Sequence, residues 1–94
     1  MTVMCTVRIP KPLEEVRAFE AANPDLMKPI GDIAARHMIS HRRMVHGDEV
    51  MDLDEFEREE DYRAFIGEAG EAIHRYGVLL GVHPEDTLWK VVNG

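Results

Sequence analysis

The strongest constraint on the fold is a pair of extended segments around a short turn, within residues 38–56. Residues 38–45 and 50–56 carry alternating apolar and polar side chains, and His46-Gly47-Asp48-Glu49 separates them. Gly followed by Asp is typical of a two-residue hairpin loop. With Gly47-Asp48 as that loop, Val45 faces Val50 and Met44 faces Met51.

The same register opposes charges along the two strands. Arg43 then faces Asp52, His41 faces Asp54, and the pair farthest from the turn is Ile39 with Phe56. Cross-strand pairs of these kinds stabilise a sheet. A shift of one residue would lose all of them together, so the sequence predicts an antiparallel hairpin in this register.

The rest of the chain predicts alternating strands and helices. Residues 2–9 read as a strand closed by prolines, and residues 13–36 as one long helical region kinked at Asn23-Pro24. A second helix starts in the acidic stretch 58–61, carries an apolar stripe to Tyr76, and stops at Gly77. Residues 78–81 form a short turn of helix or a loop, and residues 86–92 form a last strand with Trp89.

This order predicts one α+β domain over residues 1–94, with the ferredoxin-like arrangement β-α-β-β-α-β. The sheet is antiparallel and both helices lie on one face. The other face then has no cover from a chain of 94 residues. A second copy is the economical cover, so we expect a homodimer that joins through the sheet face.

Charge and cysteine content exclude several partners and compartments. The net charge of −7 argues against nucleic acid and anionic membrane, which both bind basic surfaces. No apolar run approaches the ~18 residues of a membrane span. Cys5 is the single cysteine, so no internal disulfide can form, and we expect a cytoplasmic protein with Cys5 as a core or interface thiol.

Four short motifs resemble the dimeric α/β-barrel superfamily, and within it the antibiotic-biosynthesis-monooxygenase-like proteins. They are residues 39–42, the turn 47–50, Asp54-Glu55-Phe56, and Asp61-Tyr62-Arg63-Ala64-Phe65. The element order extends the resemblance over nearly the whole chain. It implies two ferredoxin-like subunits whose sheets form one barrel, each with a cavity between its sheet and its helices.

The resemblance also implies chemistry and site residues. Some members oxidise phenolic or quinone-type substrates with dioxygen and without metal or flavin. Their cavity positions match Asp52, Phe56 and Tyr62 here, and His41 is the polar side chain of the second strand. Phe56 replaces a common Trp, and Asp52 replaces a neutral amide. Haem-degrading members use an Asn on the first strand, and residues 2–9 contain none, so no cofactor is expected.

His41 with Asp54 is the candidate catalytic pair. A carboxylate beside an imidazole fixes its tautomer and raises its basicity, as a general base requires. The alternative is a structural cross-strand ion pair, and the same alternative is stronger for Arg43 with Asp52. Arg43 and His37 complete the candidate substrate-binding set. His37 and His41 are four residues apart, but the intervening chain turns into a strand and no third ligand is evident, so no metal site is expected.

Two functions remain open at this point. The first is a cofactor-free oxygenase with an aromatic, phenolic or quinone-type substrate in the cavity between sheet and helices. The second is a non-catalytic dimeric ligand-binding or accessory protein on the same fold, for which a small aromatic compound is a possible ligand. The two differ in whether His41 faces an open cavity, or whether Met27, Met44, Phe56 and Phe65 fill that space.

Overall fold

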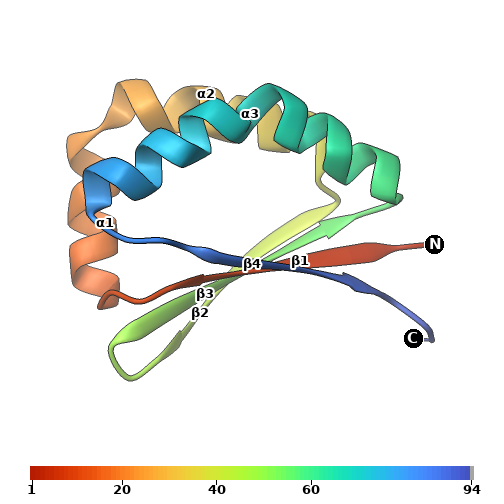
Figure 1. Cartoon of the computed structure of the whole chain (residues 1–94), viewed down its shortest axis with the longest axis horizontal. Helices are drawn as coiled ribbons and strands as arrows, with labels where there is room; N and C mark the ends of the chain where they lie inside the picture. The colour runs from red at the N-terminus through yellow and green to blue at the C-terminus, as the bar shows by residue number, and fades with distance from the viewer. Residues whose placement is uncertain (94) are drawn as a thin grey trace.

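The computed structural model describes residues 1–93 as a four-stranded antiparallel sheet with three helices on one face (Figure 1). In chain order the elements are β1 (Val3–Ile9), α1 (Leu13–Ala22), α2 (Pro24–His37), β2 (Ser40–His46), β3 (Glu49–Phe56), α3 (Glu59–Leu80) and β4 (Glu85–Lys90). The strand order across the sheet is β2-β3-β1-β4. The predicted ferredoxin-like class is therefore confirmed, with two helices in the first crossover.

The hairpin has the predicted register. Arg43 pairs with Asp52 and His41 with Asp54, and the ladder runs from Ser40–Glu55 to His46–Glu49. Gly47 has a φ of 57°, and among the described residues only glycines have a positive φ. A positive φ at the first loop position alone is the pattern of a type II′ turn, which matches the twist of the strands. The ladder ends one residue before the predicted Ile39–Phe56 pair.

The prediction of one kinked helix over residues 13–36 is wrong, because the chain breaks into α1 and α2 at Asn23. Asn23 leaves helical geometry, with φ −127° and ψ 57°. Its side-chain Nδ2 donates to the Phe19 carbonyl at 2.7 Å and so satisfies the end of α1. Pro24 then opens α2, where its missing N–H costs nothing. Figure 1 shows α1 turned away from the direction of α2.

The prediction that Gly77 ends the last helix is also wrong. α3 continues to Leu80, and Gly81 ends it in the left-handed conformation, with φ 82°. The amides of Gly81 and Val82 both donate to the Gly77 carbonyl, at 2.9 and 3.0 Å. Gly77 serves another purpose, since a Cβ there would lie 3.1 Å from the Val82 carbonyl oxygen and 3.2 Å from Pro84 Cδ.

Strand alternation gives the sheet two different faces. Val50, Asp52, Asp54 and Phe56 are buried under the helices, and they alternate along β3 with half-buried residues of the opposite face. That opposite face, which we call the outer face, carries the other residues of the registers, namely Met4, Thr6, Arg8, Ser40, Arg42, Met44, His46, Glu49, Met51, Leu53, Glu55, Glu85, Thr87 and Trp89. No element in residues 1–93 covers it (Figure 1). None of the helices in these residues is long and apolar enough to cross a membrane.

The core under the helices consists of two clusters. One joins β1, β3 and α3 through Val3, Cys5, Phe56, Phe65 and Ala69. The other joins the opposite ends of β1 and β3 to all three helices through Ile9, Val16, Leu26, Val50 and Tyr76. This division matters for the site, because the space between the two clusters is open.

Candidate functional site

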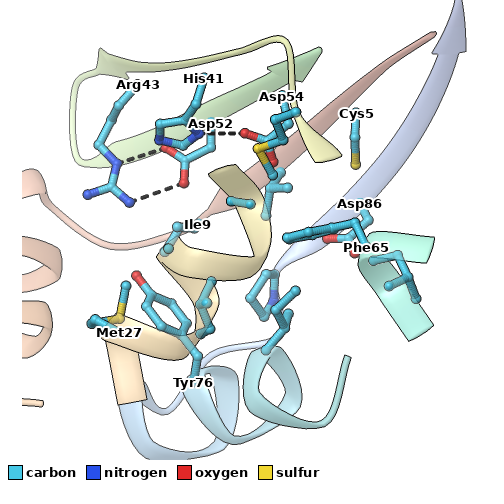
Figure 2. A pocket seen from close by; sticks show the side chains of 18 of the residues that line it. Cys5, Ile9, Met27, His41, Arg43, Asp52, Asp54, Phe65, Tyr76 and Asp86 are labelled. Carbon is cyan, nitrogen blue, oxygen red and sulfur yellow. Dashed lines mark hydrogen bonds and ion pairs between the residues drawn. The ribbon is translucent and has the colours of Figure 1, made fainter. Parts of the chain in front are cut away.

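A cavity of about 480 Å³ lies between the sheet and the helices. Its wall includes members of both core clusters, together with polar side chains from the sheet (Figure 2). Met27, Phe56 and Phe65 line it without filling it, and Met44 lies on the outer face. The structure thus has the open space that chemistry or ligand binding requires.

The antiparallel registers arrange the cavity floor in two rows across the sheet. Residues directly opposite one another point to the same face, so each row can be read through the strand order. From β2 through β3 and β1 to β4, one row is Arg43, Asp52, Val7 and Asp86, and the next is His41, Asp54, Cys5 and Leu88. Polar groups therefore gather over β2 and β3 and recur on β4, with apolar β1 side chains between.

His41 and Asp54 form the predicted pair. His41 Nδ1 lies 2.5 Å from Asp54 Oδ1, and the exposed fractions of the side chains are 50% and 10%. The hydrogen bond with Asp54 raises the pKa of His41 against the opposing effect of burial. With the Nδ1 proton donated to Asp54, neutral His41 carries its lone pair on Nε2, which is the arrangement of a general base.

Arg43 is held by two carboxylates rather than one. Its guanidinium donates to Asp52 at 2.7 and 3.1 Å and to Glu20 of α1 at 2.8 and 2.9 Å. Tyr76 of α3 donates its hydroxyl to Glu20 at 2.8 Å. Burial alone would raise the pKa of Glu20, but the hydrogen bonds from Arg43 and Tyr76 outweigh it and lower that pKa. Arg43 thereby ties β2 to α1 and α3.

Aromatic side chains and a thiol form the end of the cavity next to α3. Phe56 is fully buried, and its ring meets Tyr62 edge to face with centroids 5.5 Å apart. Burial raises the pKa of the Tyr62 phenol. Burial and the charges of Asp86 and Asp54 raise the pKa of Cys5 to about 12, so this thiol stays protonated and is a poor nucleophile.

The structure brings together six of the seven predicted site residues, namely His41, Asp54, Asp52, Phe56, Tyr62 and Arg43. His37 stands apart from this cavity wall. Its Nε2 pairs with a Glu68 carboxylate that also accepts from Arg36, which links α2 to α3. Within residues 1–93, no group of three or more His, Cys, Asp or Glu side chains is arranged to hold a metal ion.

Sequence reasoning missed four polar residues of the cavity wall, namely Arg17, Glu20, Tyr76 and Asp86. Glu20 and Tyr76 lie on helices whose position over the sheet the hairpin register does not give. Asp86 could have been found, because strand alternation places it on the same face as Leu88.

Comparison with known proteins adds a fold but no sequence family. No family model matches the chain, and no curated protein matches its sequence. Among solved structures, Rv0793 from Mycobacterium tuberculosis superposes with a TM-score of 0.71 at 16% identity, covering 100% of this chain and 98% of that one.

Two further structures carry informative descriptions. SnoaB, a cofactor-independent oxygenase from Streptomyces nogalater, has a TM-score of 0.66 at 12% identity and covers 99% of this chain and 95% of that chain. A dimeric ferredoxin-like protein from an uncultured marine organism has a TM-score of 0.63 at 13% identity, with 99% and 90% covered. The chain therefore has a ferredoxin-like fold, which it shares with these proteins.

Proposed function

We propose that this protein is a cofactor-free oxygenase of the antibiotic-biosynthesis-monooxygenase type, acting on a phenolic or quinone-type aromatic substrate. The observation that carries the proposal is the His41–Asp54 pair in the wall of an open, largely apolar cavity. A volume of about 480 Å³ falls within the range of small-molecule sites. The resemblance in fold to the oxygenase SnoaB supports the same class.

His41 is the base in this proposal. Its Nε2 takes the proton of a substrate hydroxyl, and Asp54 stabilises the imidazolium that forms. The resulting phenolate is rich in electrons and reduces dioxygen directly. For a substrate with an activated ring CH2, one dioxygen converts that carbon to a carbonyl, and the second oxygen atom leaves as water. This oxidation therefore requires no external reductant.

The remaining predicted residues have different roles in this proposal. Tyr62 presents an aromatic ring to the substrate at the α3 end of the cavity, and the fully buried Phe56 packs against that ring edge to face. Arg43 is occupied by Glu20 and Asp52, so we assign it to fixing the polar wall beside His41. His37 has no place in this mechanism, because its imidazole pairs with Glu68 away from the cavity wall.

A non-catalytic ligand-binding module is the second candidate. The observation that favours it is the half-exposed side chain of His41, which leaves the imidazole partly hydrated. Such a module would bind the same aromatic compounds in the same cavity and return them unchanged.

We also propose that the protein is a cytoplasmic homodimer joined through the outer face. Met44 and Trp89 are 44% and 56% exposed there, and no described element covers them. A dimeric protein of the same fold supports this arrangement. Light scattering should give twice the chain mass of 10.7 kDa, and a monomer at micromolar concentration would contradict it.

Oxygen consumption tests the proposed activity. The protein is incubated in air with a panel of anthrone, naphthol and quinol compounds, and dioxygen uptake and products are followed together. We expect uptake with at least one hydroxylated aromatic and its loss in His41→Gln, with Arg75→Gln on the exposed side of α3 as the control. Binding without uptake would favour the ligand-binding module. Uptake unaffected by His41→Gln would remove His41 from the mechanism.

A further inference from the structure

Asp86 differs from the other three carboxylates of the cavity. Glu20 and Asp52 both accept hydrogen bonds from Arg43, and Asp54 pairs with His41. Within the part of the chain that the structure describes, no side chain donates a hydrogen bond to Asp86 or forms an ion pair with it. The residue as a whole is exposed, so water reaches its carboxyl, while the partial burial of that carboxyl and the charge of Asp54 raise its pKa.

Asp86 also stands opposite the polar groups of β2 and β3. It ends the row that begins at Arg43, with Asp52 and Val7 between them. Three strand spacings, about 14 Å between backbones, separate β2, which carries His41, from β4, which carries Asp86. Two fused aromatic rings with a hydroxyl at each end, together with the hydrogen bond that each hydroxyl makes, span a comparable length. In Figure 2 Asp86 lies across the pocket from His41 and Arg43.

The cavity meets a surface groove at this residue. The groove lies along α3 and the loop that leads into β4, and it shares Ile66, Ile73, Pro84 and Asp86 with the cavity wall. His74 and His83 line the groove but make no contact with the Asp86 carboxylate among the described hydrogen bonds and ion pairs. A ligand that reaches this end of the cavity therefore meets a carboxylate whose oxygens are still available.

We propose that Asp86 is a specificity residue that accepts a hydrogen bond from a second hydroxyl or amino group of the ligand, at the end away from His41. This rests on the proposed use of the cavity as the substrate site. It narrows the ligand to an elongated aromatic compound with a hydrogen-bond donor at each end. A ligand with an apolar far end would bury the Asp86 carboxylate without a partner, and a site of this kind rejects such analogues.

Two naphthols test the inference without requiring turnover. 2-Naphthol has one hydroxyl, and 2,6-dihydroxynaphthalene has one at each end of the same ring system. Both fluoresce, so their dissociation constants can be measured by anaerobic titration of the intact protein. We expect the diol to bind about tenfold more tightly, since a hydrogen bond to a charged group is worth roughly 1.5–3 kcal/mol and 1.4 kcal/mol is tenfold.

Variants of Asp86 should remove this preference. Asp86→Val, which suits a strand, should bring the ratio of the two constants to about one. Asp86→Asn keeps an acceptor oxygen without the charge and should leave a ratio below about threefold. Glu85→Gln makes the same charge change on the opposite face of β4, where Glu85 is exposed beside Arg8, and should leave the ratio unchanged.

Three results would overturn the inference: equal affinities in the native protein, a ratio that survives Asp86→Val, or no binding of either compound. Oxygen uptake is measured separately on the same samples. A diol preference that depends on Asp86, without uptake, would support this inference while the proposed oxygenase activity fails. Oxygen uptake without a preference for the diol would support the oxygenase activity and refute the role of Asp86.

Discussion

Replacement of Arg43 by Met should destabilise the protein more than its position on an edge strand suggests. Arg43, Glu20 and Asp52 have side chains only 22%, 19% and 12% exposed, so water screens them little. Removal of the guanidinium leaves two carboxylates facing one another without a counter-ion. Breaking a buried pair in this way costs roughly 3–5 kcal/mol, and the hydrogen bond that Tyr76 still gives to Glu20 places the expected loss near the lower end, about 3 kcal/mol.

The loss should depend on pH in a defined direction. In the native protein the pKa of Glu20 lies below its ordinary value of 4.5. Its ionised form therefore stabilises the fold above pH 4.5, and this contribution is lost as the pH falls through the native pKa. In Arg43→Met the two carboxylates repel, and protonation relieves them. The difference in unfolding free energy between native and variant should shrink from pH 7 to pH 4.

Urea unfolding followed by far-ultraviolet circular dichroism measures both quantities. Native protein, Arg43→Met, Arg43→Lys and Arg75→Met are compared at one protein concentration, because a dimer's stability depends on concentration. Arg43→Lys keeps the charge but not the paired geometry and should lose about 1–2 kcal/mol. Arg75 is exposed, and its variant should change by less than about 0.5 kcal/mol. A loss for Arg43→Met below 1 kcal/mol, or one equal at both pH values, would refute the reasoning.

Three further changes have definite expected outcomes. Asp54→Asn should move the acidic limb of the kcat/KM profile for oxygen uptake to lower pH, toward 6.5, because Asp54 raises the pKa of His41 and the base must be neutral. The plateau of the profile should fall roughly 10²-fold or more. An acidic limb that does not move would exclude the His41–Asp54 pair from the mechanism. Gly77→Ala should lower the free energy of unfolding in urea by about 1 kcal/mol, because the new Cβ meets Val82 and Pro84. Gly67→Ala has open space around the new Cβ and should raise that free energy by up to about 1 kcal/mol. Similar values for the two variants would contradict the packing around Gly77. Trp89→Lys should give a monomer by light scattering at micromolar concentration, and an intact dimer would place the interface elsewhere.

The hairpin was predictable because local chemistry determines it. Its loop residues, its charge pairs and its strand alternation all agree on one register, and the structure has that register from Ser40 to His46. The same register identified the pairing of His41 with Asp54 and of Arg43 with Asp52. The register also fixes which residues of β3 share a face, and the structure shows that the face with Asp52 and Asp54 lies under the helices.

The helices were harder to predict because long-range packing decides them. The sequence predicts one helical region kinked at Asn23-Pro24, whereas the Asn23 side chain donates to the Phe19 carbonyl and so ends α1 before α2 begins. In the sequence Gly77 has the appearance of a helix stop signal. The structure requires glycine there because the loop after α3 packs closely against it, and α3 ends at Gly81 instead. Glu20 joins the site only because α1 turns over the sheet toward Arg43, which no spacing within the sequence encodes.

A crystal structure with a bound phenol, determined without dioxygen, tests the central claim most directly. The protein is crystallised under anaerobic conditions with the hydroxylated aromatic that binds most tightly. We expect the ring to lie inside the cavity against Tyr62, with its hydroxyl oxygen about 2.8 Å from His41 Nε2. A ligand bound outside the cavity, or one whose hydroxyl points away from His41, would contradict it.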